Sequence, residues 1–130
     1  MCNNSTCSRD TASDDPPAQT FSAVKAKYHK ISAAKAHKMM SESKDFILLD
    51  VRTDEEYREQ RIEGAVLLPD FEITDRAEKE LPDKNKLMFV YCRSGRRSES
   101  ASKVLVSLGY TQVFDIGGIL NWPYETIGGQ

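Results

Sequence analysis

The stretch that decides the fold lies at residues 87–98, which read LMFVYCRSGRRS. Its first five residues form an apolar run typical of a buried β-strand, and Cys92 follows directly. A small arginine-rich loop comes next, and residues 96–108 then carry apolar side chains at helical spacing: Ala101, Val104, Leu105 and Leu108. A thiol at this junction faces backbone N–H groups and the positive end of a helix dipole, and both favour a thiolate. The stretch therefore predicts a strand–loop–helix unit suited to nucleophilic sulfur chemistry on an anion.

Strands and helices alternate before this unit. The pattern predicts a short edge strand at residues 28–31, a helix capped by Ser32, and a strand at 46–51 that is covered on both faces. Thr53 and Glu56 form the capping box of a further helix.

The remaining segments complete the alternation. We expect a short buried strand at residues 65–68, a short helix within 70–81 and a last strand at 112–116. Gly117-Gly118 is expected to end that strand before a terminal helical turn. This order predicts an α/β protein whose sheet is mainly parallel and carries helices on both faces.

The composition describes an ordinary globular domain. The chain has 130 residues, of which 39% are hydrophobic and 29% charged. A net charge of −2 gives no support for nucleic-acid binding. Between residues 86 and 103, however, five basic residues stand against one acid, Glu99, so positive charge gathers around the cysteine.

The N-terminal region differs from the rest. Residues 1–24 are polar and are expected to be a disordered tail, which leaves residues 25–130 as the folded domain. The tail holds Cys2 and Cys7, a spacing with no partner pair, so no metal site is predicted. No apolar run is long enough for a transmembrane helix, and a free domain thiol suits a reducing compartment, so a cytoplasmic protein is the default expectation. The alternative is a lipoprotein anchored to the cell envelope through Cys2, if Met1 replaces a removed signal peptide.

The candidate site residues each have a competing structural interpretation. Cys92 could fill a hole in the core, but its arginine-rich neighbours favour a nucleophile. The arginines could be a solvated patch, yet guanidinium groups match the oxygens of sulfate-like anions. The predicted substrate-binding residues are Arg93, Ser94, Gly95, Arg96 and Arg97. Asp50 and Arg52 are supporting candidates that could equally tie loops together.

Several blocks of the sequence together resemble a single-domain rhodanese. They are ILLDVR at 47–52, EY at 56–57, IEGA at 62–65, CRSGRRS at 92–98 and GGILNW at 117–122, in the order of that family. The resemblance covers roughly residues 28–124 and implies a three-layer fold with a five-stranded sheet. It also implies a thiosulfate sulfurtransferase in which Cys92 carries the sulfur, without a metal or organic cofactor. The implied partners are a small anionic sulfur donor and a thiol or cyanide acceptor, with a sulfur-accepting protein as a further candidate.

The chain departs from the family at one point and leaves two alternatives open. Gln60-Arg61 stands where the family usually has Gly-His, and this change is expected to affect local packing more than catalysis. A related phosphatase or arsenate reductase needs five residues between cysteine and arginine, whereas four separate Cys92 from Arg97. A non-catalytic rhodanese-like binding module commonly lacks the cysteine, which this chain retains.

Overall fold

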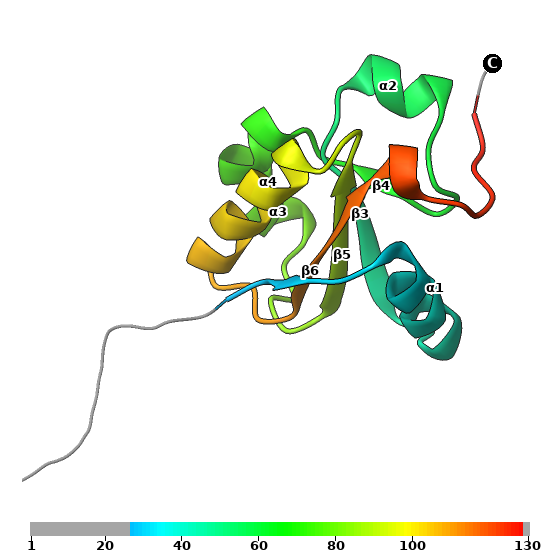
Figure 1. Ribbon diagram of the computed structural model, residues 1–130. Helices are drawn as coiled ribbons and strands as arrows, with labels where there is room; N and C mark the ends of the chain where they lie inside the picture. The colour runs from blue at the N-terminus through cyan, green and yellow to red at the C-terminus, as the bar shows by residue number, and fades with distance from the viewer. Residues whose placement is uncertain (1–26, 129–130) are drawn as a thin grey trace, which may run out of the picture.

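The computed structural model describes residues 27–128 and contains a five-stranded sheet in the order β2-β6-β5-β3-β4. Every pair of neighbouring strands is parallel, which confirms the predicted α/β class. The elements, drawn in Figure 1, are β2 (His29–Lys30), α1 (Ala33–Glu42), β3 (Phe46–Asp50), α2 (Asp54–Glu59), β4 (Val66–Leu67), the 3-10 turn η1 (Asp70–Glu72), α3 (Ile73–Glu80), β5 (Leu87–Cys92), α4 (Arg96–Ser107), β6 (Val113–Gly118) and the 3-10 turn η2 (Ile119–Asn121).

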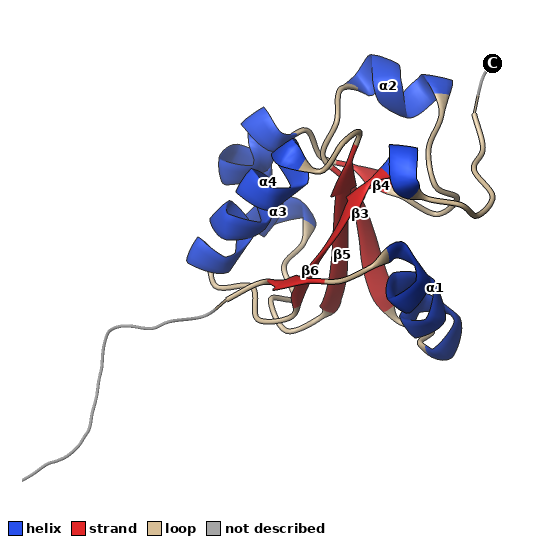
Figure 2. Cartoon of the chain, viewed as in Figure 1, coloured by secondary structure: helices blue, strands red, loops and turns tan. Residues whose placement is uncertain are grey.

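Side chains of β5 alternate between two hydrophobic cores, because successive residues of a strand point to opposite faces of the sheet. Met88, Val90 and Cys92 belong to one core, together with residues of α3 and α4. Phe89 and Tyr91 belong to the other, together with Ala36 of α1. Helices therefore cover both faces of the sheet, with α3 and α4 on one side and α1 on the other (Figure 2).

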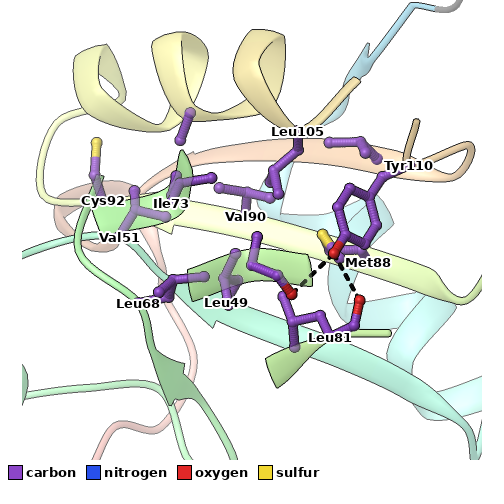
Figure 3. Packing of buried hydrophobic residues seen from close by; sticks show 13 residues of the cluster. Leu49, Val51, Leu68, Ile73, Leu81, Met88, Val90, Cys92, Leu105 and Tyr110 are labelled. Carbon is purple, nitrogen blue, oxygen red and sulfur yellow. Dashed lines mark hydrogen bonds between the residues drawn. The ribbon is translucent and has the colours of Figure 1, made fainter. Parts of the chain in front are cut away.

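The core between the sheet and α3 and α4 ends at Cys92 (Figure 3). Figure 3 shows Cys92 beyond Val51 and Ile73, at the carboxyl edge of the strands. At the far end of this core, the buried Tyr110 hydroxyl donates to the carbonyl oxygens of Ala77 (3.0 Å) and Leu81 (2.6 Å). These contacts hold the end of α3 against the segment that follows α4.

Two helix caps form as predicted, and a glycine ends a third helix. The Ser32 hydroxyl accepts from the Lys35 N–H and caps α1. Thr53 and Glu56 form the reciprocal capping box of α2. Gly109 follows the end of α4 with a φ of 103°, a left-handed conformation that glycine adopts without strain.

Several element boundaries differ from the sequence prediction. The strand expected at 65–68 is limited to two residues, and the helix expected within 70–81 is a 3-10 turn followed by α3. The expectation that Gly117-Gly118 ends the last strand is wrong, because β6 includes both glycines. A register shift lets β6 continue: Val90 pairs with Asp115, whereas Tyr91 pairs with Gly117.

Some expectations concern residues outside 27–128. The predicted tail at 1–24 and its cysteines Cys2 and Cys7 lie outside the described residues. Within 27–128, no helix combines the length and apolar character needed to cross a membrane. The same residues include no cluster of histidine, cysteine and carboxylate side chains that could hold a metal ion.

Candidate active site around Cys92

Cys92 is the last residue of β5 and its side chain is fully buried. The chain turns through Gly95, whose φ of 110° is a conformation that favours glycine, and α4 begins at Arg96. This turn brings the Gly95 N–H to 2.9 Å from the Cys92 Sγ, where it donates a hydrogen bond. The sulfur therefore lies beneath a backbone donor and near the positive end of the α4 dipole, and both stabilise negative charge on sulfur.

The loop after Cys92 packs directly against the end of β6. Gly118 pairs with Cys92, and a Cβ atom at Gly118 would lie 2.2 Å from the Arg93 carbonyl oxygen and 2.7 Å from the Ser94 Cα. The Leu120 N–H donates to the same Arg93 oxygen at 3.2 Å. Only glycine leaves room for the loop to lie this close to the sheet. This role of Gly118 was not predicted from the sequence, although the Gly117-Gly118 pair was its visible signal.

A buried acid and serine fasten the start of α4 to β6. The Ser98 hydroxyl lies 2.7 Å from Asp115 Oδ1, and the Gly117 N–H donates to the same oxygen at 2.9 Å. Both side chains are fully buried, and Ser98 Oγ also lies 3.1 Å from the Gly95 carbonyl oxygen. Asp115 therefore supports the turn that carries the Gly95 donor. No local sequence pattern identified it, because it lies in an otherwise apolar strand.

Arg97, predicted to bind substrate, makes a two-pronged ion pair with Glu56 of α2. Its Nη1 and Nη2 donate to the two carboxylate oxygens at 2.8 and 3.0 Å. These hydrogen bonds are the largest cause of a raised Arg97 pKa; burial opposes the shift, and the negative charge of Glu56 adds to it. Arg97 thus links the first turn of α4 to α2, and its charge is largely compensated by Glu56.

Glu56 is held in place from both sides. Its Oε1 also accepts from the Thr53 N–H and hydroxyl, each at 3.1 Å. The hydrogen bond from Arg97 is the main reason that the pKa of Glu56 falls to about 2; burial opposes the shift and the Thr53 bonds add to it. The capping residue predicted for α2 therefore also anchors the loop around Cys92, a second role that the sequence did not reveal.

The other predicted loop residues lie at the rim. Arg93, Ser94 and Arg96 are exposed, and neither Arg93 nor Arg96 forms an ion pair within residues 27–128. Beside Arg93 is a pocket of about 180 Å³ whose lining also includes Glu59 of α2 and Leu120 of η2. The rim therefore carries two exposed arginines that have no ion-pair partner among residues 27–128.

Asp50 and Arg52 form a buried network on the other side of β5. Arg52 donates to Asp50 through Nε (2.9 Å) and Nη2 (2.7 Å) and also to the Gln60 carbonyl oxygen. The Tyr91 hydroxyl donates to Asp50 Oδ2 at 2.8 Å and accepts from the Ile62 N–H at 3.1 Å. Burial, followed by the charge of Asp50, raises the Tyr91 pKa. These contacts match the loop-tying role considered for Asp50 and Arg52.

Gln60 and Arg61, which replace the usual Gly-His, contact the C-terminal segment. Arg61 and Ile127 exchange two backbone hydrogen bonds of 2.8 Å, and Gln60 Nε2 lies 3.0 Å from Thr126 Oγ1. The Arg61 guanidinium lies over the Tyr57 ring, 4.7 Å from its centroid. The positive charge that Arg61 adds is therefore directed to α2.

The fold and this geometry define an α/β protein with a cysteine-centred loop at the carboxyl edge of a parallel sheet. A family model described as the rhodanese-like domain matches residues 32–124, and the chain belongs to that family. This agrees with the sequence resemblance and with the observed order of the sheet.

Named relatives and a solved structure agree with this assignment. Thiosulfate sulfurtransferase PspE of Escherichia coli is 39% identical over 71 residues, which cover 55% of this chain and 68% of that protein. Thiosulfate sulfurtransferase GlpE of Coxiella burnetii is 33% identical over 96 residues, covering 73% and 87% respectively. A structure of a rhodanese with anions from E. coli aligns with a TM-score of 0.60 and 35% identity, over 64% of this chain and 98% of that one.

Proposed function

We propose that this protein is a sulfurtransferase that moves a sulfane sulfur from thiosulfate, or from a related persulfide donor, to a thiophilic acceptor. The observation that carries the proposal is the buried Cys92 sulfur beneath the Gly95 N–H, at 2.9 Å, where α4 begins. Family membership and relatives named thiosulfate sulfurtransferases support it.

The reaction takes place in two displacements. The Cys92 thiolate attacks the outer sulfur of thiosulfate, the S–S bond breaks, and sulfite leaves with the bonding electron pair. A persulfide anion remains on Cys92, and the Gly95 N–H and the α4 dipole stabilise its charge. A thiolate or cyanide then attacks the outer sulfur, and the Cys92 thiolate is the leaving group. The chemistry uses no metal or organic cofactor.

The loop residues divide into two roles in this proposal. Arg93 and Arg96 attract the anionic donor from the rim, and Ser94 and Gly95 form the turn that the donor meets. Arg97 acts mainly through its ion pair with Glu56, which fixes the loop relative to α2. Arg97 is therefore a positioning residue for substrate binding. It does not bind the donor directly, because its charge is paired with Glu56.

Mass spectrometry of the intact protein tests the persulfide directly. After incubation with thiosulfate and removal of the excess, the protein should gain the mass of one sulfur atom, and peptide mapping should assign it to Cys92. Addition of cyanide should remove that mass and yield thiocyanate. A protein that gains no sulfur, or gains it equally after Cys92→Ser, contradicts the proposal.

Neutralising the rim cations should weaken donor binding. Arg93→Ala and Arg96→Ala should each raise the KM for thiosulfate with little change in kcat, because the donor is an anion. Both side chains are exposed. Each charge contributes at most about 1 kcal/mol, or about fivefold in KM. Steady-state kinetics at low and high salt measure the effect, which salt should reduce. An unchanged KM in both variants would mean that these arginines form only a solvated patch.

The Glu56–Arg97 pair should make the free energy of unfolding depend on pH in the acidic range. Because folding lowers the pKa of Glu56 from 4.5 to about 2, this group stabilises the fold above pH 4.5 and loses that contribution as the pH falls towards 2. Between pH 4.5 and about 2, the free energy of unfolding of the wild type should fall by at most about 3 kcal/mol more than that of Glu56→Gln. Urea unfolding at several pH values measures the difference. Glu63→Gln, at an exposed position, is the control and should follow the wild type.

A further inference from the structure

Two bulky apolar side chains near the active-site loop are left in solvent. Phe71 of η1 is 70% exposed and Leu120 of η2 is 61% exposed, more than any other large hydrophobic side chain in residues 27–128. Most large apolar residues of this domain are buried, so two such side chains exposed beside the active-site loop mark a candidate contact surface.

The two side chains come from opposite sides of the loop. On one side, the Leu120 N–H binds the Arg93 carbonyl oxygen, and Leu120 and Arg93 line the same pocket. On the other side, η1 contacts α4, and the charge of Asp70 in η1 acts on Arg97. Figure 1 shows η2, in orange, directly after β6 and below α2. Ile119 of η2 packs in the core on the α1 side of the sheet, whereas Ile73, directly after η1, packs in the core on the α3 and α4 side.

The charges on the loop between Phe71 and Leu120 indicate what kind of molecule would cover these two side chains. Arg93 and Arg96 are exposed on the loop and form no ion pair within residues 27–128. Arg97, the third loop arginine, is compensated by Glu56, and the pocket beside Arg93 also contains Glu59. The uncompensated charge on the loop itself is positive, so it complements an acidic partner.

Thiosulfate is a small, charged donor, so exposed apolar side chains do not contribute to its binding. A surface that buries both Phe71 and Leu120 is better supplied by a macromolecule. We infer that the sulfur acceptor is a thiol on an acidic protein or peptide, whose apolar residues flank its cysteine and pack on Phe71 and Leu120. This inference rests on the proposed sulfurtransferase function and names the acceptor class of that same site.

The transfer to such an acceptor follows the second displacement. The acceptor thiolate attacks the outer sulfur of the Cys92 persulfide, the S–S bond to Cys92 breaks, and Cys92 leaves as a thiolate. The acceptor becomes a persulfide anion. No external oxidant or reductant is needed, because the sulfane sulfur changes only its partner.

Three synthetic peptides test the acceptor class. The first has one central cysteine, leucines on both sides and glutamates at both ends; the second replaces the glutamates with lysines, and the third replaces the leucines with serines. The measured quantity is the kcat/KM for each peptide divided by the kcat/KM for cyanide, with thiosulfate as donor, so differences in folded fraction cancel. The first peptide should exceed each of the others by about tenfold, equivalent to roughly 1.4 kcal/mol.

Variants connect the preference to the two side chains. Phe71→Ser and Leu120→Ser should each lower the ratio for the leucine-glutamate peptide about threefold or more, since each removes part of the apolar contact. Val66→Ser is the matched control: Val66 is 45% exposed and lies in β4, outside the loop and its two flanking turns. Its ratio should equal that of the wild type.

The outcomes separate this inference from the proposed function. Equal ratios for the three peptides, a preference for the lysine peptide, or unchanged ratios in both Phe71→Ser and Leu120→Ser would overturn the inference while leaving sulfur transfer intact. Absence of any thiosulfate:cyanide activity in the wild type would instead contradict the proposed function.

Discussion

Replacement of Cys92 by serine should abolish sulfur transfer from thiosulfate to cyanide. Serine has no sulfur to carry, and Cys92 is the free cysteine of the folded domain. The hydroxyl is close in size to the thiol and still offers an acceptor to the Gly95 N–H, so the fold should survive. Activity is measured by thiocyanate formation, and folding by circular dichroism and thermal unfolding.

Cys2→Ser and Cys7→Ser are the matched controls, since both residues lie outside the described domain. Each should retain the activity of the wild type. Full activity in Cys92→Ser would refute the persulfide mechanism, and loss of activity in either control would point to a role for the N-terminal cysteines that we do not propose.

Replacement of Gly118 by alanine should have the next largest effect. The added Cβ would meet the Arg93 carbonyl oxygen at 2.2 Å and the Ser94 Cα at 2.7 Å, and both are backbone atoms that cannot rotate away. The loop must therefore move or the strand must shift. We expect a loss of about 3 kcal/mol in the free energy of unfolding. A displacement of the loop by about 1 Å should also lower kcat/KM about a hundredfold.

Gly64→Ala separates backbone strain from loop displacement. Gly64 has a φ of 88° but no atom within 4 Å of its added Cβ. Alanine there should destabilise the protein by about 1 kcal/mol through strain alone, with kcat unchanged. Chemical unfolding and steady-state kinetics on both variants make the comparison. Wild-type activity in Gly118→Ala would mean that the loop adapts without moving the Gly95 donor from the sulfur.

For Arg97, the sequence motif suggested a substrate-binding role but not the ion pair with Glu56. The sequence placed Arg97 beside the cysteine and favoured a substrate-binding charge. The structure pairs both of its nitrogens with Glu56, which the sequence had assigned only to a helix cap. Direct substrate binding by Arg97 remains a prediction of the sequence; our proposal instead gives Arg97 a positioning role through Glu56 and assigns direct contact with the donor to Arg93 and Arg96.

The sequence alone determined the element types, their order and the position of Cys92. Alternating apolar runs, the caps at Ser32 and Thr53, and the helical spacing after residue 96 all depend on neighbours within a few positions, so they can be recognised locally. The sequence segments that resemble rhodaneses also identified the family, because their order along the chain is itself a property of the sequence. The exact ends of short elements, such as β4 and η1, were less accurate since only tertiary pairing defines them.

Only the tertiary structure decided which residues support the loop around Cys92. Glu56 and Arg97 are 41 positions apart, and Ser98 and Asp115 are 17 apart, so no local pattern connects either pair. Gly118 is required by the approach of a loop from another strand, a steric condition that its own neighbours do not express. The exposure of Phe71 and Leu120 has the same origin: either residue could have been core, and the folding of two turns beside one loop left both in solvent.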